Sequence, residues 1–294
     1  MIIEVIQKNK PSPHAPNALR KRLISGLGVG GFGLLVVSLG GWWFTAALGG
    51  MVHLGLLEFF RMAQFKGIRP ATKTTLVACQ LLLIITQLAP GSPWAAAVLP
   101  LAGSVICGWL LLQPVTGTIA DIAASIFGLF YLGFLPSHWV RLRDLSPAWV
   151  APDWPLNPGL AITLLAFVLI WAADCGAYLW GSRFGRTRLS EVSPGKTVEG
   201  ALAGVLATVL TGAMGGWLLG WPLGPLLGAG LGGLVALFAL VGDLTESMMK
   251  RDAGVKDSGA LIPGHGGILD RVDSYLFTPA VVFYAVTLVL PLVG

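Results

Sequence analysis

Long apolar runs recur along nearly the whole chain. A membrane-spanning helix needs about 20 mainly apolar residues, and nine runs of that order can be marked out. They lie at residues 23–40, 42–60, 74–89, 94–113, 118–139, 160–180, 201–219, 223–242 and 275–293. Charged residues make up only 11% of the chain, whereas soluble domains contain about 25%. The pattern excludes a water-soluble globular enzyme and an intrinsically disordered chain.

The runs favour helices over strands. A membrane β-barrel uses strands of about ten residues with alternating apolar and polar side chains. The runs here are about twice as long and do not alternate. We therefore predict an all-α integral membrane protein, a polytopic helix bundle with about nine transmembrane helices. The first two runs are short and meet at Gly40 and Gly41, so one long tilted helix, and eight spans in total, is the alternative.

Basic residues indicate how the helices are oriented. Nine spans place 17 of the 19 Lys and Arg residues on one side of the membrane and leave only Arg141 and Arg143 on the other. The positive-inside rule makes the richer side cytoplasmic. The sequence then divides into a polar cytoplasmic N-terminus (1–22), about five N-terminal helices (23–139) and a C-terminal catalytic region (160–294). The cytoplasmic loops of that last region are 181–200 and 243–274.

The loop at 243–274 is the first candidate for chemistry, because it is charged within a charge-poor chain. It holds six of the 14 acidic residues within 32 positions. Asp270 and Asp273 are three residues apart and share a face if helical, an arrangement that suits Mg²⁺ and its oxygen ligands. Gly266 and Gly267 let a ligand approach the backbone closely. A solvated charged loop is the simpler alternative.

A second candidate region runs from Asp174 to Gly200. Asp174 lies near the end of a spanning run, where an ionisable side chain is costly and needs a partner. The basic residues that follow suit anionic phosphate, although a positive-inside loop would carry them as well. Both candidate regions fall on the cytoplasmic side. Charges at helix ends favour an enzyme that joins a water-soluble substrate to a lipid, whereas a transporter of anionic solutes would carry them near the midplane.

Two further features of the sequence have simpler interpretations. Gly224, Gly228 and Gly232 recur every four residues, which is typical of a helix-packing face. Such faces allow a homodimer without requiring one. The net charge of +5 lies mainly where anionic headgroups of the cytoplasmic leaflet would be, and no loop is long enough to fold into a nucleic-acid-binding module. We therefore expect no nucleic-acid partner.

The motif SMMKRDAGVKDSGALIPGHGGILDRVD, from Ser247 to Asp273, resembles the signature of the phosphatidate cytidylyltransferase (CDP-diacylglycerol synthase) family over its whole length. The stretch from Asp174 to Gly200 is also similar to the family. It departs at Gly195, where a lysine is common, and at Val198, where an aromatic residue is common. These departures bear on fine positioning only. The two motifs lie within the C-terminal part of the chain.

The resemblance implies that CTP and phosphatidate react to give CDP-diacylglycerol and pyrophosphate with Mg²⁺, with K⁺ as a plausible second cation. The expected metal ligands are Asp243, Asp270 and Asp273. The expected catalytic and phosphate-binding residues are Lys250, Arg251, Lys256, Asp257, His265 and Arg271, together with the three aspartates. The expected substrate-binding residues are Asp174, Arg183, Ser193, Lys196, Thr197, Glu199, Ser247, Gly266 and Gly267.

Two other functions are compatible with a cytoplasmic site of this composition. A CTP-dependent lipid-alcohol kinase, similar to polyprenol or phytol kinases, would yield a phosphorylated lipid and CDP. A transporter of anionic solutes would consume no nucleotide. The complete signature argues against both. Without an organelle signal in the sequence, we expect a plasma membrane location, as in the bacterial inner membrane.

Overall fold

The computed structural model describes residues 28, 30–146, 157–261 and 266–293. Within these ranges the regular elements are all helices, and no β-strand forms. An isolated bridge joins Arg188 and Thr197 in the loop between two helices. The prediction of an all-α polytopic membrane protein is confirmed.

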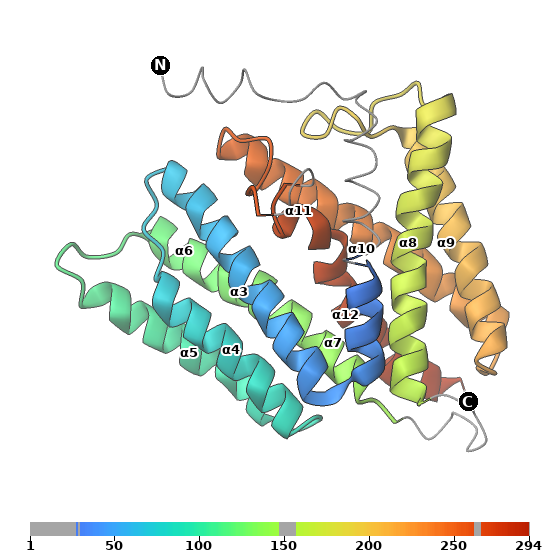
Figure 1. Ribbon diagram of the computed structural model, residues 1–294, viewed down its shortest axis with the longest axis horizontal. Helices are drawn as coiled ribbons and strands as arrows, with labels where there is room; N and C mark the ends of the chain where they lie inside the picture. Colours follow the sequence, from blue (N-terminus) through green and yellow to red (C-terminus); the bar gives the residue numbers. More distant parts are fainter. Residues whose placement is uncertain (1–27, 29, 147–156, 262–265, 294) are drawn as a thin grey trace.

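The helices follow one another with short connections (Figure 1). An unlabelled helix at Gly30–Leu39 comes before α3. The others are α3 (Gly41–Phe65), α4 (Thr72–Leu88), α5 (Trp94–Leu111), α6 (Ile119–Gly128), the π-helical η1 (Leu129–Phe134), α7 (Leu135–Arg143), α8 (Pro158–Phe184), α9 (Val198–Leu218), α10 (Gly224–Asp252), α11 (Leu269–Val272), α12 (Ser274–Tyr284), η2 (Ala285–Val289) and η3 (Leu290–Leu292).

Seven helical segments among the described residues are long and apolar enough to cross a membrane. They are α3, α5, the continuous run Ile119–Arg143, α8, α9, α10 and the run Leu269–Leu292. Gly30–Leu39 and α4 are shorter apolar helices. Together these helices occupy the nine predicted runs. How many of them span the membrane, and in which direction, stays a prediction.

The first two apolar runs form separate helices. The first helix ends at Leu39, and α3 begins at Gly41. Gly40 and Gly41 have φ angles of 66° and 51°, a backbone conformation that glycine adopts without the steric penalty of a side chain. Arg143 donates hydrogen bonds to the carbonyl oxygens of Val37 and Ser38 at this turn, at 2.7 and 3.2 Å. The structure therefore favours two segments over one long tilted helix.

The helices form two neighbouring groups (Figure 1). Helices α3 to α6 pack together on one side, and α8, α9 and α10 pack together on the other. Helix α12 contacts both α10 and α7, and α7 contacts α4 and α8. The interface between the groups is thus built from α7 and α12. It brings the C-terminal motif beside α3.

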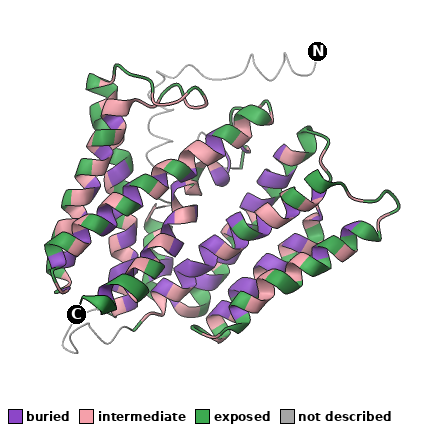
Figure 2. Ribbon diagram, turned by 180° about the vertical axis from the view of Figure 1, so that it is seen from behind, coloured by how far each residue is buried: buried purple, intermediate pink, exposed green. Residues whose placement is uncertain are grey.

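The outer surface of the bundle is apolar. Figure 2 shows buried residues on the faces where helices meet and exposed residues on the outward faces. On α9, Leu202, Leu206 and Leu210 are 65, 60 and 62% exposed, four residues apart on one face. Exposing a continuous apolar surface of this kind to water is unfavourable, whereas contact with lipid chains is favourable. The chain is a multi-pass membrane protein.

Helices α9 and α10 pack at very short range through glycines, as the four-residue repeat predicts. A Cβ atom added at Gly228 would collide with the carbonyl oxygen of Gly212. One added at Gly232 would collide with that of Thr208, and one at Gly224 with that of Gly216. These collisions are with backbone atoms, which cannot rotate away. The predicted packing face is confirmed within the chain.

We expect Gly228→Val to separate α9 from α10 and to destabilise the protein by about 2 kcal/mol or more, the usual range for overpacked interiors. Gly230→Val is the matched control, because no atom lies within 4 Å of a Cβ there. Thermal unfolding in detergent measures both. Equal melting temperatures for the two variants would contradict the close packing.

The helices extend further into the predicted loops than the hydropathy pattern indicates. The predicted loop at 243–274 is wrong at its start, because α10 continues to Asp252. Likewise α8 continues to Phe184, and α9 begins at Val198, within the predicted loop 181–200. The apolar run ends at the membrane boundary, but the helical hydrogen bonds do not require apolar side chains. Acidic and basic residues of α10 therefore project from a rigid helix.

Candidate active site

A cavity of about 460 Å³ lies where α8, α9 and α10 meet the start of α12. Small residues shape its walls, among them Ala173 and Ala177 on α8 and Ala236 and Ala239 on α10. Its charged lining comes from Asp174, Lys196, Asp243, Asp270, Arg271 and Asp273. Four carboxylates from α8, α10, α11 and the start of α12 thus line one space, although they are up to 99 positions apart in the sequence.

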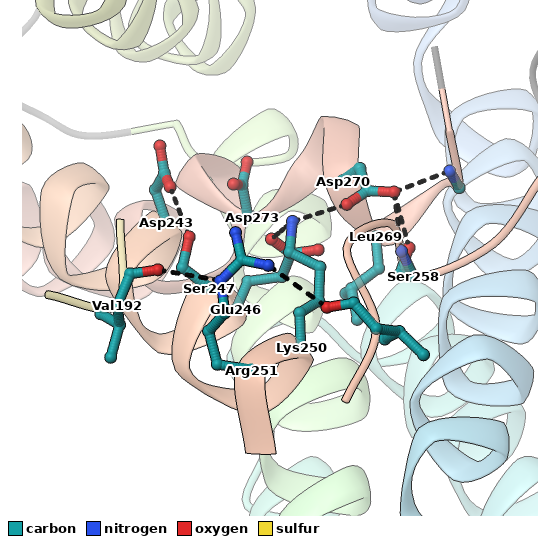
Figure 3. A network of polar contacts seen from close by, with 12 residues as sticks. Val192, Asp243, Glu246, Ser247, Lys250, Arg251, Ser258, Leu269, Asp270 and Asp273 are labelled. Atoms are coloured by element: carbon teal, nitrogen blue, oxygen red, sulfur yellow. Dashed lines mark hydrogen bonds and ion pairs between the residues drawn. The ribbon is translucent and has the colours of Figure 1, made fainter. Parts of the chain in front are cut away.

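The first carboxylate, Asp243, lies on α10 and forms an ion pair with Lys196. Lys196 belongs to the loop before α9, so the pair joins that loop to α10. Both side chains are partly exposed, at 30% for Lys196 and 24% for Asp243. Ser247, one turn further along α10, donates a hydrogen bond of 3.5 Å to Asp243. In Figure 3 the carboxylates of Asp243 and Asp273 point to the same side of α10.

Lys250 lies between two other carboxylates. Its Nζ is 2.6 Å from Oδ1 of Asp270 and also forms an ion pair with Glu246, one turn earlier on α10 (Figure 3). The Glu246 side chain is 1% exposed and the Lys250 side chain is 12% exposed. Buried charges of this kind are stable only when they are paired. Lys250 therefore fixes the position of Asp270 relative to α10.

Asp270 accepts several hydrogen bonds from the loop between α10 and α11. Its Oδ2 accepts from the backbone N–H of Ser258 at 2.9 Å, from the Ser258 hydroxyl at 3.1 Å and from the N–H of Gly267 at 2.8 Å. Oδ1 faces Lys250. The carboxylate thus organises the loop between α10 and α11. Asp270 also lines the cavity, so these bonds fix a carboxylate at its wall.

The lining of the cavity is rich in acid, with four carboxylates against two basic side chains. Asp273, the last of the four, accepts a hydrogen bond of 2.8 Å from the N–H of Ser274 at the start of α12. Among the described residues no group of three His, Cys, Asp or Glu side chains is already arranged as a metal site. The donor set nevertheless fits a hard cation, which takes carboxylate oxygens and keeps positions for phosphate.

The loop between α8 and α9 is shaped by two of the predicted residues. Glu199, in the first turn of α9, accepts hydrogen bonds from the N–H groups of Arg186 and Thr187 at 3.1 and 3.2 Å. Thr197 caps α9 by accepting a bond of 3.2 Å from the N–H of Gly200. Thr197 lines the cavity and Glu199 does not. These contacts hold Lys196 at the cavity wall.

The structure brings some predicted site residues together and leaves others apart. Those that line the cavity are Asp174, Lys196, Thr197, Asp243, Asp270, Arg271 and Asp273. Those that lie outside its lining are Arg183, Ser193, Glu199, Ser247, Lys250, Arg251, Lys256, Asp257, Gly266 and Gly267. Lys250, Ser247 and Gly267 contact lining carboxylates, as described above. His265 lies outside the described residues.

Arg251 makes a structural contact that the motif does not predict. Its guanidinium donates hydrogen bonds to the carbonyl oxygens of Val192 and Val255, at 3.3 and 3.4 Å. It thereby joins the loop before α9 to the end of α10 (Figure 3). This structural contact does not test whether Arg251 also binds phosphate.

Two acidic residues near the cavity are not predicted as site residues by the motifs. Glu246 contacts Lys250, as described, and is fully buried. Glu58, on α3, accepts hydrogen bonds from Ser258, Ile268 and Leu269 around Asp270. A signal for Glu58 exists in the sequence, because it is an acidic residue inside an apolar run. Its partners, about 200 positions away, could not be read from the sequence.

Known proteins similar to this chain bear on the function of the cavity. The sequence matches the cytidylyltransferase family over residues 20–289. A phosphatidate cytidylyltransferase of Synechocystis sp. is 52% identical, and the match covers 90% of this chain and 94% of that protein. A phosphatidate cytidylyltransferase of Pseudomonas aeruginosa is 41% identical, over 92% and 97% of the two chains. The chloroplastic phosphatidate cytidylyltransferase 4 of Arabidopsis thaliana is 38% identical, over 99% and 79%.

Proposed function

The chain belongs to the cytidylyltransferase family, and we propose that its acid-rich cavity transfers the cytidylyl group of CTP to phosphatidate. The family and the names of its relatives make the chain a nucleotidyltransferase enzyme of phospholipid biosynthesis. One observation supports the cavity as the site. In a chain with 11% charged residues, four carboxylates, Lys196 and Arg271 line a single space.

The reaction makes modest demands on the protein. A phosphate oxygen of phosphatidate attacks the α-phosphorus of CTP, the bond from that phosphorus to the bridging oxygen breaks, and pyrophosphate leaves. The attacking phosphate is already anionic, so no strong general base is required. Catalysis then depends on orienting two anionic substrates and on compensating their charge. The fixed ion pairs supply orientation, whereas charge compensation requires bound cations, because four carboxylates outnumber two basic side chains in the lining.

We propose that Asp243, Asp270 and Asp273 would hold Mg²⁺ here, and that Asp174, which also lines the cavity, would take part in substrate binding. Bound Mg²⁺ would neutralise phosphate charge and polarise the reacting phosphoryl group. Neighbouring groups of the protein would hold these carboxylates in place. Lys250, Ser258 and Gly267 orient the Asp270 carboxylate, and outer contacts of this kind tune a metal site. A second cation such as K⁺ is part of the same proposal.

The basic residues are proposed to bind phosphate groups. Lys196 and Arg271 line the cavity itself, so they are placed to contact the CTP phosphates. Lys256 and Arg183, outside the lining, would meet the headgroups of substrate lipid at the membrane surface. Ser193, Asp257, Gly266 and His265 are proposed to take part in substrate binding on the basis of the family motif alone.

The reaction also bears on where the protein works. CTP is water-soluble and phosphatidate is a membrane lipid, so the cavity should open at the cytoplasmic face of a plasma membrane. We propose a bacterial-type inner membrane location, no nucleic-acid partner, and a monomer or homodimer. The positive-inside distribution of 17 of 19 basic residues supports the orientation.

Labelled CTP tests the proposed function. Purified protein in detergent receives Mg²⁺, phosphatidate and CTP labelled at the α-phosphate, and the lipid phase is counted. Label in the lipid that requires phosphatidate establishes cytidylyl transfer. Label that enters a lipid alcohol only from γ-labelled CTP would instead indicate the kinase. No transfer from either nucleotide would favour the transporter of anionic solutes.

The orientation predicts which surface positions can be labelled from outside. In a background with Cys79, Cys107 and Cys175 replaced by alanine, we expect Ser146→Cys to react with an impermeant thiol reagent in intact cells. Asp252→Cys, whose native side chain is 68% exposed, should react only after the cells are opened. The reverse result would invert the proposed topology.

A further inference from the structure

Glu58 is a buried carboxylate in the middle of the N-terminal helices, far in sequence from every predicted site residue. It lies on α3 and is 8% exposed. A carboxylate inside a membrane segment is costly unless its oxygens are satisfied. The proposed reaction gives Glu58 no obvious role, because Glu58 does not line the cavity. Its contacts therefore need a separate explanation.

Both oxygens of Glu58 accept hydrogen bonds from the C-terminal motif. Oε2 accepts from the Ser258 hydroxyl at 2.8 Å and from the N–H of Leu269 at 2.9 Å. Oε1 accepts from the N–H of Ile268 at 3.0 Å. These three hydrogen bonds hold Ser258, Ile268 and Leu269 against α3.

Two glycines in the same segment make room for this carboxylate. A Cβ atom added at Gly259 would lie 2.8 Å from Cδ of Glu58. A Cβ atom added at Gly267 would collide with Oε2 of Glu58 and with the Ser258 hydroxyl. Any side chain at either position would push the carboxylate away. The motif therefore has glycine at the two positions where Glu58 approaches closely.

The contact continues from Glu58 to the cavity through Ser258. The Ser258 hydroxyl lies 2.8 Å from Oε2 of Glu58 and 3.1 Å from Oδ2 of Asp270. Ile268 and Leu269, which also bind Glu58, directly precede Asp270 in the chain. Asp270 in turn contacts Lys250. Glu58 is thus one polar contact away from a carboxylate that lines the cavity.

We infer that Glu58 is a positioning residue for cytidylyl transfer: it holds Ser258 and the turn before Asp270, and so fixes the Asp270 carboxylate in the cavity. This inference rests on the proposed function of the cavity. Displacing a reacting group by about 1 Å can lower a rate by about 100-fold. Glu58 would therefore affect turnover without touching either substrate.

Glu58→Gln is the direct test. The amide keeps the size of the side chain, but its nitrogen cannot accept a hydrogen bond from an N–H group. We expect kcat to fall by about tenfold or more while KM for CTP changes less than about threefold, because a positioning defect acts on the transition state. In the free protein, hydrogen exchange of the peptide that carries Ile268 and Leu269 should become faster. This exchange measurement requires no activity.

Asp121→Asn is the matched control for burial. Asp121 is also a buried carboxylate of the N-terminal helices, 2% exposed, and it accepts bonds from the N–H groups of Arg69 and Thr118 at 2.6 and 2.7 Å. Neither Arg69 nor Thr118, which donate these bonds, is a proposed site residue or adjoins one. We expect Asp121→Asn to lower the melting temperature but to leave the kcat of the folded protein unchanged. Equal loss of kcat in both variants would reduce Glu58 to a structural residue.

Ser258→Ala keeps the inference falsifiable if Glu58→Gln does not fold. It removes the shared hydroxyl and leaves Glu58 with two N–H donors. We expect a loss of kcat similar to that of Glu58→Gln, and in the double variant a smaller loss than the product of the single effects. Wild-type kcat in either single variant would overturn the inference. If wild-type protein transfers no label, the proposed function fails, and the exchange measurement still decides whether Glu58 holds the turn.

Discussion

Asp270→Asn is expected to lower cytidylyl transfer by about 100-fold to 1000-fold, the loss usual for a preorganised charged group at a reacting centre. The substitution removes a negative charge that faces Lys250 at 2.6 Å. It also places an NH₂ group where one of the two oxygens accepts hydrogen bonds from Lys250 or from Ser258 and Gly267. Label transfer from α-labelled CTP to lipid, measured on the monodisperse membrane protein, gives the result.

Asp252→Asn is the control for this substitution. Asp252 lies at the end of α10, and its 68% exposed side chain forms a surface ion pair of 3.2 Å with Lys66. Such pairs contribute at most about 1 kcal/mol, so activity should stay near the wild-type value. Wild-type turnover in Asp270→Asn would exclude Asp270 from the site.

Removal of divalent metal is expected to stop transfer altogether. Chelation with EDTA should lower the rate to the level without enzyme, and added Mg²⁺ should restore it, because charge compensation of the phosphates would be lost. Asp243→Asn should raise the Mg²⁺ concentration needed for half-maximal rate by about tenfold or more. It removes one carboxylate of the cavity and the ion pair with Lys196.

Glu191→Gln provides the comparison for the Mg²⁺ titration. Glu191 is an exposed acid in the same loop as Lys196, and it does not line the cavity. The variant has the same change in net charge as Asp243→Asn, so it reports the general electrostatic effect. The same shift in Mg²⁺ dependence for both variants would contradict a specific role for Asp243. Full activity in EDTA would contradict a divalent metal.

The helical membrane fold could be predicted from the sequence because its cause is local. Each apolar run must satisfy its own backbone hydrogen bonds in lipid, and a helix does this within the run. The sequence left open whether the runs on either side of Gly40 and Gly41 form one helix or two, and the positive φ angles of both glycines divide them in the structure. The end of α10 could not be predicted, because hydropathy reports where lipid contact stops. The helix itself continues ten residues past Gly242, to Asp252.

The motif predicts Asp243, Asp270 and Asp273 as site residues, and the structure places all three at one cavity, while their metal-binding role stays a prediction. The prediction failed to find Glu58, whose environment depends on tertiary structure. Nothing near Glu58 in the sequence indicates that Ser258, Ile268 and Leu269 are its partners. The contacts of Arg251 with the carbonyl oxygens of Val192 and Val255 also depend on tertiary structure, and phosphate binding by Arg251 stays a prediction.

The hydrogen bonds between α3 and the turn before α11 have a consequence for modularity. A truncated protein that begins at Pro158 would retain all the proposed site residues and would still lack Glu58. Ile268 and Leu269 would then lose their common acceptor, and the surfaces of α8, α11 and α12 that contact α3, η1 and α7 would be uncovered. The catalytic motif is therefore not a portable unit. The positions of its side chains depend on contacts with the N-terminal helices as well as on the motif itself.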